Sequence, residues 1–587
     1  RIPLEFTRVY NAMGGKETVM GMGWSCNYMD HLEKKGENLH LLEGDGREEI
    51  FAPIDTTSAE IRYLSVFGSY EEIIETEGGF RWKKEEEEYF FNKQGKLVSY
   101  QKSTVGSLNF CYEGEQLVQV NREDGASLSY VYQEDGKLAK VKDHTGREIL
   151  FSYEKGQLAE VIATDGTKTA YAYDEKRRLK SITNAIGLKK VTNTYDKNGR
   201  VLKQDFADGE MMQYEYQDEE KRIALIERNG AKTVYVHDEK NRHVKTIHED
   251  GEESFSYNEK NKRVFYTDPM GNSFQRTFDN RGNITSVIDE AGNITHYTYD
   301  ANNHLVSFKD PFGNQTVYRY DSKGNMTEAI AADGTSTQIS YNEQNQPQKV
   351  INPDGSKIEI SYDGAGNILA VAEEGKGTTS YRYDNLNRVI ASIDGEGNET
   401  CYAYDAKDRI VAVTNAEGRI RSYTYQELGK ITALNDFDGN EESWEYGVIA
   451  KPLWYKDKAG RSTFYEYDAM RNVSKVVAPN GAESFFTYNK KNQLASMTNP
   501  LGHTIFYTYD ANGNCVEQTD EVGNKKKFTY NANNQLTSVT DEVGAVTTME
   551  YNALGKLIAK RLPNGSCETY RYDSMNRIIE KTDVIGN

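Results

Sequence analysis

The sequence predicts an all-β protein: a spiralling antiparallel sheet of β-hairpin repeats that forms a hollow shell, preceded by a β-rich N-terminal cap. Three observations carry this prediction. A tyrosine recurs every 21 residues, a glycine recurs fourteen residues after it, and the apolar content is low. Only 37% of the 587 residues are hydrophobic, mean hydropathy is -0.77, and 41 tyrosines stand against 4 tryptophans. So few apolar side chains do not fill a thick globular core in a chain of this length.

The tyrosine lattice keeps a constant step of 21 residues from Tyr257 to Tyr572, with one phenylalanine among its members. Upstream the step varies between 20 and 22 residues, and Phe91 is expected to be the first member. This period predicts about 23 tandem repeats over 91–587, with the array truncated at its C-terminal end. The repeat glycine is expected through to Gly586. An aspartate directly follows the lattice tyrosine in these pairs: Tyr299 and Asp300, Tyr320 and Asp321, Tyr383 and Asp384, Tyr404 and Asp405, Tyr467 and Asp468, Tyr509 and Asp510, and Tyr572 and Asp573.

Each 21-residue unit is predicted to form one hairpin. Tyr507 and Tyr509 lie two residues apart, so they share one face of a strand. The segments 510–514 and 520–524 contain the Asp, Asn and Gly residues typical of turns, and Gly523 is expected at positive φ. Residues 515–519 between them have the length of a second strand. No window keeps an apolar 3.6-residue period long enough for a helix.

The repetition itself predicts the architecture. One hairpin is marginally stable alone, but neighbouring hairpins can pair edge to edge and satisfy each other's backbone groups. With two strands per repeat and roughly 4.8 Å per strand, the flat strip would be on the order of 220 Å long. Because strands twist, the strip is expected to coil. We therefore expect a thin wall around a space.

Residues 1–90 lack the period and are predicted to form the β-rich cap, because an open repeat array needs a terminal unit. Within it, Gly21 and Gly23 are expected in a tight turn and Trp24 as an apolar anchor. The stretch Gly-Met-Gly-Trp-Ser-Cys could also be read as a phosphate-binding loop. Cys26 occupies the place of the third glycine and no strand-to-helix context follows, so the turn is favoured.

Composition excludes several classes of function. The 71 basic and 91 acidic residues give a net charge of -20, which argues against nucleic-acid binding and against binding to anionic membranes. No apolar run approaches the roughly 18 residues of a membrane-spanning helix, and the N-terminus does not resemble a signal peptide. The 5 cysteines are widely spaced without a CxxC pair, which supports neither a disulfide framework nor a zinc site.

No catalytic, cofactor-binding or metal-binding residues are predicted. The segment 510–514 resembles a calcium loop but lacks the glycine and glutamate that such a loop requires. His237, His243 and His248 form the only histidine cluster, without an HExxH motif or a cysteine partner. Carboxylates are too frequent to single out an acid/base pair. The tyrosines are expected to form cross-strand ladders, with carbohydrate stacking as the alternative.

Two stretches carry a resemblance to a known family. Tyr383-Asp-Asn-Leu-Asn-Arg-Val389, with Arg388 as its basic residue, and Tyr572-Asp-Ser-Met-Asn-Arg-Ile578 are similar to the signature of the RHS, or YD-repeat, family. The Phe-Thr-Arg-Val-Tyr-Asn, Gly-Met-Gly-Trp and Asp-Gly-Arg stretches resemble the segment that precedes the repeats in bacterial members. The resemblance covers essentially the whole chain. It implies a hollow cocoon, as in bacterial polymorphic toxins, insecticidal toxin complexes and teneurins.

In the bacterial members of this family, the shell encloses a C-terminal toxin domain that an autoproteolytic core segment releases. This sequence begins with Arg1 and stops within a repeat at residues 583–587, so we expect an excerpt that lacks the toxin and the core segment. The resemblance implies a secreted or cell-surface, non-enzymatic shell. Its implied partners are its own toxin domain as cargo and, for the full-length protein, secretion machinery or an immunity protein. The alternative function is a cell-surface adhesion or carbohydrate-binding module.

Overall fold

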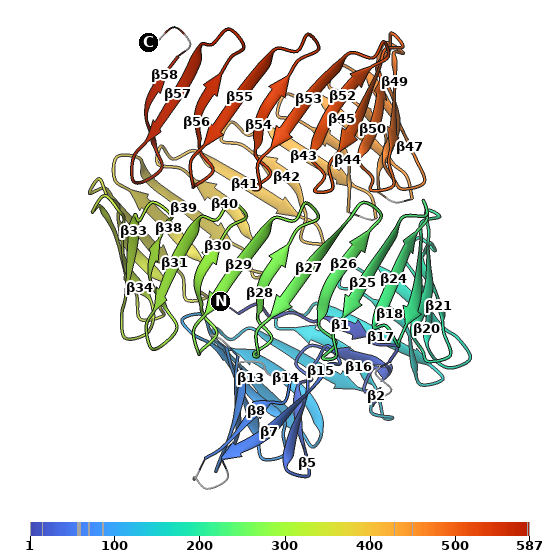
Figure 1. Ribbon diagram of the computed structural model, residues 1–587. Helices are drawn as coiled ribbons and strands as arrows, with labels where there is room; N and C mark the ends of the chain where they lie inside the picture. Colours follow the sequence, from blue (N-terminus) through green and yellow to red (C-terminus); the bar gives the residue numbers. More distant parts are fainter. Residues whose placement is uncertain are drawn as a thin grey trace.

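The protein is built from strands and turns (Figure 1). The structure, a computed structural model, describes residues 2–13, 16–55, 60–67, 71–84, 87–427, 429–448, 450–583 and 585. The all-β class predicted from the sequence is confirmed. Among these described residues no helix is long and apolar enough to cross a membrane. Gly586, the last expected repeat glycine, lies outside the described residues.

Each regular repeat is one hairpin. Strand β51 (Thr504–Tyr509) pairs antiparallel with β52 (Cys515–Asp520), and β52 pairs in turn with β53 (Lys525–Tyr530). The first turn is closed by two main-chain hydrogen bonds, from Gly513 N to Asp510 O at 3.1 Å and from Asp510 N to Asn514 O at 3.0 Å. The second turn has Gly523 at a φ of 91°. The two turns of a repeat therefore lie on opposite edges of the strip.

Within the described residues, one antiparallel sheet of 54 strands contains all the repeat hairpins. Each of its strands pairs with the next strand along the chain, through to β58 (Ile578–Thr582). The sheet runs without a break through residue 90, so the division of the chain there remains a prediction. Its first eight strands are β5 (His31–Lys35), β6 (Asn38–Leu42), β7 (Glu48–Asp55), β8 (Ile61–Ser65), β9 (Glu72–Thr76), β10 (Gly79–Lys84), β11 (Glu87–Asn92) and β12 (Leu97–Lys102).

The sheet coils, as strand twist requires, and the coils stack above a narrow N-terminal tip (Figure 1). Three contacts between stacked coils join residues 244 positions apart. That separation corresponds to roughly twelve repeats, or about 23 strands, per coil. At about 4.8 Å per strand, one coil has a circumference of about 110 Å and a diameter of about 35 Å.

The narrow tip is closed by the first strand of the sheet. Leu32 N in β5 donates a hydrogen bond to Gly95 O at 2.9 Å, and His31 forms an isolated antiparallel bridge with Lys96. Both partners belong to the turn between β11 and β12. The exposed backbone groups of an edge strand are thus satisfied by the strip itself.

The N-terminal segment forms two short strand pairs of its own. Strand β1 (Arg8–Tyr10) pairs with β4 (Trp24–Cys26), and β2 (Glu17–Thr18) pairs with β3 (Gly21–Met22). Strand β3 contacts β18 (Gln157–Ile162) of the large sheet.

Among the residues that the structure describes, the buried apolar cluster lies around this segment. Met20, Trp24 and Cys26 lie in one buried cluster with side chains from β5 through β20 (Leu179–Thr183). Side chains from so many consecutive strands of a curled sheet can meet only on its concave face. Beyond Leu179 the fully buried hydrophobic residues among those described are three alanines, Ala224, Ala391 and Ala559. The later coils therefore form a wall around a concave side that no apolar core fills.

The turn glycine at 523 supports a first prediction. A Cβ atom at Gly523 would meet nothing within 4 Å, so only the backbone conformation opposes a side chain there. Gly523→Val is expected to destabilise the repeat by about 1–3 kcal/mol, because a β-branched residue is strained at positive φ. Urea unfolding and hydrogen exchange across 515–530 measure the effect.

The matched control is Gly364→Val. Gly364 also lies in a turn, and a Cβ atom there would likewise meet nothing within 4 Å, but its φ is not positive. This variant should leave unfolding and exchange close to those of the parent. Equal effects of the two substitutions would show that the φ of Gly523 is not what limits this turn.

Candidate functional site: the inner wall and its closed end

Most hairpins are fastened to the previous one by the hydroxyl of their lattice tyrosine. The Tyr509 hydroxyl donates a hydrogen bond to the main-chain oxygen of Leu494 at 2.8 Å. Leu494 pairs with Tyr488 beside a β-bulge, where the register shifts by one residue. The same bond to the residue fifteen positions back is made by Tyr132, Tyr153, Tyr173, Tyr216, Tyr320, Tyr341, Tyr362, Tyr383, Tyr404, Tyr425, Tyr467, Tyr488, Tyr530, Tyr551 and Tyr572.

The aspartate after the tyrosine closes the turn. Asp384 Oδ1 accepts hydrogen bonds from the backbone N–H groups of Leu386 at 2.9 Å and Arg388 at 3.0 Å, and Oδ2 accepts one from Arg388 Nε at 2.7 Å. Where asparagine replaces the arginine, its amide makes the same contact, as Asn325 does with Asp321. That hydrogen bond to the charged carboxylate lowers the pKa of Asp321 below its ordinary value.

The signature arginine also reaches the next repeat. The Arg388 guanidinium carbon lies 4.6 Å from the ring centroid of Tyr404, and that of Arg409 lies 4.4 Å from the ring of Tyr425. Cation–π contacts of this kind add to the binding of one hairpin to its neighbour. Tyrosine, aspartate and arginine therefore act together as a fastening that recurs along the strip.

The remaining signature residues occupy equivalent places. His304 takes the arginine position after Tyr299 and Asp300: its Nδ1 lies 2.9 Å from Asp300 Oδ2, and its ring stacks on Tyr320. The lattice spreads these residues one set per repeat, so they do not converge on a single site. The other signature aspartates likewise bind the side chain four residues later: Asp405 binds Arg409, Asp468 binds Asn472, Asp510 binds Asn514, and Asp573 binds Arg577.

The lattice tyrosines lie on the concave face. In the first coil Tyr112, Tyr132, Tyr153 and Tyr173 pack against the buried cluster that encloses Trp24. Because each strand pairs in register with the next, the tyrosines of later repeats lie on the same face. The inner surface of the wall is therefore lined by half-buried tyrosine rings whose hydroxyls are largely bonded to the wall itself.

At the closed end, Trp24 anchors the N-terminal segment. Its side chain is only 4% exposed, and its Nε1 donates a hydrogen bond to the Tyr173 hydroxyl at 2.7 Å. Tyr173 in turn donates to Leu158 O at 2.7 Å. The anchor of the segment is thus bonded directly to a lattice tyrosine.

Gly21 and Gly23 lie where the backbone of the N-terminal segment closely approaches other residues of the protein. Gly21 has a φ of 102°, and a Cβ atom there would lie 2.8 Å from Gln157 Oε1. Gly23 has a φ of 75°, and a Cβ atom there would lie 2.7 Å from Asn11 O. Neither position has space for a side chain.

Two residues that hold this segment were not expected from the sequence. Gln157 Oε1 accepts a hydrogen bond from Met22 N at 2.7 Å, and the Tyr10 hydroxyl accepts one from Leu179 N at 2.8 Å. A polar residue at the start of a strand, such as Gln157 in β18, is ordinary in this sequence, so no pattern marks it. Tyr10 lies outside the period.

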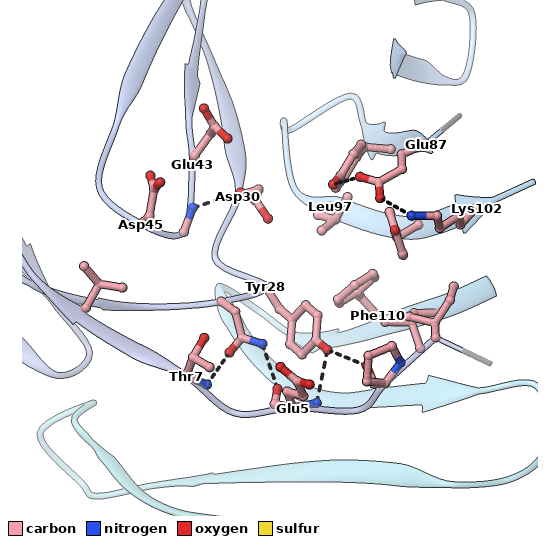
Figure 2. A pocket seen from close by; sticks show the side chains of 18 of the residues that line it. Glu5, Thr7, Tyr28, Asp30, Glu43, Asp45, Glu87, Leu97, Lys102 and Phe110 are labelled. Atoms are coloured by element: carbon pink, nitrogen blue, oxygen red, sulfur yellow. Dashed lines mark hydrogen bonds and ion pairs between the residues drawn. The ribbon is translucent and has the colours of Figure 1, made fainter. Parts of the chain in front are cut away.

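A cavity of about 600 Å³ lies between the N-terminal segment and the strands of the tip (Figure 2). Five carboxylates line it: Glu5, Asp30, Glu43, Asp45 and Glu87. Burial raises the pKa of Asp30, whose Oδ1 accepts a hydrogen bond from Gly44 N at 2.8 Å, and burial also raises the pKa of Glu43.

These carboxylates are largely engaged by the protein. Lys102 Nζ lies 3.1 Å from Glu87 Oε1, and Arg47 pairs with both Glu43 and Asp45. Within the described ranges, no group of three His, Cys, Asp or Glu side chains is arranged to hold a metal ion. Of the histidine cluster, His237 and His243 have ring centroids 5.8 Å apart, and His248 Nδ1 lies 3.5 Å from the Thr233 hydroxyl.

Comparison with family models identifies the repeat. The teneurin YD-shell model matches residues 72–230 and 372–547, which together make up more than half of the chain. The chain belongs to the RHS/YD-repeat shell family. The RHS repeat model matches 278–307, 299–336, 530–566 and 551–584 of this YD shell, and a domain of unknown function, DUF6531, matches residues 1–51. A search of curated protein sequences finds no match to this chain.

Solved structures share the fold of this YD shell. One is the Tc holotoxin pore of Photorhabdus luminescens, with a TM-score of 0.54 and 15% identity over 89% of this chain and 30% of that one. Another is the TcdB2-TccC3-Cdc42 crystal structure, with a TM-score of 0.55 and 11% identity over 95% of this chain and 40% of that one. The chain thus spans less than half the length of these neighbours. At these identities the similarity shows a common fold.

The tyrosine hydroxyl bond supports a second prediction. Tyr509→Phe removes the donor to Leu494 O and should destabilise the wall locally by about 0.5–1.5 kcal/mol. Hydrogen exchange of β51 and of β50 (Leu494–Thr498), the strand of the preceding hairpin with which it pairs, is expected to quicken, because the bulge carbonyl loses its partner.

Tyr507→Phe is the matched control. Tyr507 lies on the same face, and Phe486 and Phe528 occupy the equivalent place in the repeats before and after. Exchange in this variant should stay at the parent rate. Unchanged exchange in Tyr509→Phe as well would mean that the hydroxyl bond does not hold neighbouring hairpins together.

Proposed function

We propose that this chain is a segment of a shell that encloses a C-terminal toxin or effector domain of its own full-length protein. The observation that carries the proposal is the end of the apolar core at Leu179. The concave face continues beyond this point for two further tiers of strands (Figure 1). A wall that curves around an unfilled space, closed at one end, is suited to surround another polypeptide.

The comparisons support a cargo of this kind. The solved structures with the same fold are those of a holotoxin pore and of TcdB2-TccC3 assemblies. The cargo would be supplied by sequence that this chain does not contain. For the full-length protein we propose a secreted or cell-surface location, with secretion machinery or an immunity protein as further partners.

The proposed role is non-enzymatic. The residues that recur along the chain are used by the wall itself: tyrosine hydroxyls bind main-chain carbonyls, and aspartates close turns. We propose neither a cofactor nor a metal for this function. Nucleic acid is not proposed as a partner either, since the net charge of -20 opposes it.

A fusion experiment tests enclosure. A small protease-sensitive domain joined through a flexible linker after Asn587 should enter the shell and resist proteolysis about tenfold longer than the free domain. The same domain mixed with the shell without a linker is the control and should be digested at the rate of the free domain. Electron micrographs should show added density inside the wall only for the fusion. Equal digestion of the fused and the mixed domain, or a solid particle without a lumen, would contradict the proposal.

One observation favours the second candidate function, a carbohydrate-binding or adhesion module. Phe464, Phe485 and Phe506 each lie three residues before a lattice tyrosine and so point to the convex face, where they are 48%, 43% and 49% exposed. Trp454 pairs with Phe464 in the adjacent strand. The three rings recur every second strand, roughly 10 Å apart. Aromatic faces in such a row suit stacking on sugars.

Replacing the outer row tests this candidate. The triple variant Phe464→Ala, Phe485→Ala and Phe506→Ala should reduce glycan binding on an array by about tenfold or more, since each stacking contact contributes about 1 kcal/mol. Phe486→Ala, which removes a ring from the concave face, should leave binding unchanged. A parent protein that binds no glycan on the array would remove this candidate.

A further inference from the structure

Stacked coils of the strip meet mainly through side chains; one main-chain oxygen takes part, Lys490 O, which accepts a hydrogen bond from Asn229 Nδ2 at 3.0 Å. In the described part of the chain, each strand of the large sheet pairs only with its neighbours along the sequence. The contacts between coils are made by turns. The charged side chains that meet there are 241 to 263 residues apart in the sequence. We call this line of contacts the seam. No ladder of main-chain hydrogen bonds crosses it among these residues.

The two edges of the seam differ in charge. The lower coil contributes the turns that contain the repeat glycine, and these carry carboxylates. The upper coil contributes turns that follow the lattice tyrosine, and these carry lysine and arginine. The ion pairs are Lys407 with Asp165 at 3.0 Å, Lys490 with Glu249 at 2.8 Å, Lys491 with Asp250 at 2.6 Å, Arg577 with Asp333 at 3.3 Å, and Arg471 with Asp208.

Amide contacts complete the same line. Asn512 Nδ2 donates a hydrogen bond to Asp268 Oδ2 at 2.7 Å, and Asn533 Nδ2 donates to Asp289 Oδ2 at 3.1 Å. One pair has the opposite polarity, Arg147 of the lower coil with Asp408 of the upper coil at 2.8 Å. The carboxylates of the lower edge thus accept nearly every contact across the seam.

The seam is weaker than the strip on either side of it. Its ion pairs range from exposed, with Lys490 and Glu249 at 57% and 54%, to partly buried, with Lys407 and Asp165 at 24% and 9%. Exposed pairs of this kind contribute little each, and salt screens them because the Debye length falls to about 3 Å at 1 M ionic strength. Within the strip, every strand is held by main-chain hydrogen bonds that salt leaves largely intact.

We propose that the shell opens along this seam: the coils separate edge from edge while the strip remains folded. Opening of this kind gives a large cargo a path through the wall without unfolding the sheet. The inference deepens the proposed enclosing function and rests on it for its purpose. The opening itself is a property of the chain without cargo.

Carbodiimide cross-linking of the unmodified protein tests the opening, because it joins only lysine and carboxylate groups in contact. At about 0.05 M sodium chloride, peptides containing Lys407 joined to Asp165 and Lys491 joined to Asp250 are expected. At about 1 M sodium chloride their yield should fall at least about fivefold relative to Lys525 joined to Glu517. That control pair, 2.8 Å apart, bridges the adjacent strands β52 and β53 within the strip. An equal loss at all three pairs, or no loss at the seam, would overturn the proposal.

Charge reversal provides the second measurement. Because one reversal leaves the other contacts of the seam in place, Lys407→Glu, Lys491→Glu and Arg577→Glu are combined; together they should abolish the cross-links to residues 165 and 250 and increase the radius of gyration measured by X-ray scattering at low salt. Adding Asp165→Lys, Asp250→Lys and Asp333→Lys should restore both the cross-links and the compact radius. A combined variant that stays expanded would overturn the proposal.

These measurements use the chain without cargo, so they separate the two proposals. A seam that opens in a shell that protects no fused domain would remove the enclosing function and leave the opening standing. A fused domain that is protected in a shell whose seam never opens would remove the proposed opening and leave the enclosing function standing.

Discussion

The structure depends on the hydrogen bond that most lattice tyrosines donate to the bulge carbonyl of the preceding hairpin. A hairpin alone is marginally stable, and a slip of one residue in its pairing moves every side chain to the opposite face. The bulge beside Leu494 would leave a main-chain oxygen without a partner, and the Tyr509 hydroxyl supplies one. The bond can form only when the next hairpin is in register. The 21-residue period therefore also sets the register in which neighbouring hairpins pair.

Stability is distributed unevenly along this strip. At the tip, residues from β5 to β20 share a buried cluster with the N-terminal segment, and β5 closes on the turn at Gly95. Beyond Leu179 each hairpin relies on its two neighbours, as in other linear repeat proteins. The segment around Trp24 thus has two effects: it supplies the apolar contacts that the later coils lack, and it fixes which face of the sheet becomes the inner one.

Much of the fold follows from the sequence because the period appears in every repeat. Tyrosines two residues apart predict a shared strand face, and Asp, Asn and Gly predict both turns, with Gly523 at positive φ. The pattern does not reveal which face is concave, since alternation says only that Tyr507 and Tyr509 share one. That choice depends on packing against residues 2–30, which lie outside the period. The contacts across the seam could not be predicted from the sequence either. The number of repeats per coil is set by strand twist and by closure of the coil, and no residue type encodes that number.

The low hydropathy of the chain is a consequence of this architecture. A wall one sheet thick has two faces, and beyond the tip neither face is covered by a second layer. Large hydrophobic side chains on either face of a strand would therefore be exposed to water. Tyrosine resolves the conflict: its ring covers neighbouring strands, while its hydroxyl satisfies a main-chain oxygen that would otherwise need a solvent or protein partner. A mean hydropathy of -0.77 with 41 tyrosines is thus what a folded, single-layered enclosure requires. The same composition in a chain without the period would lack the pairing that makes each hairpin the support of the next.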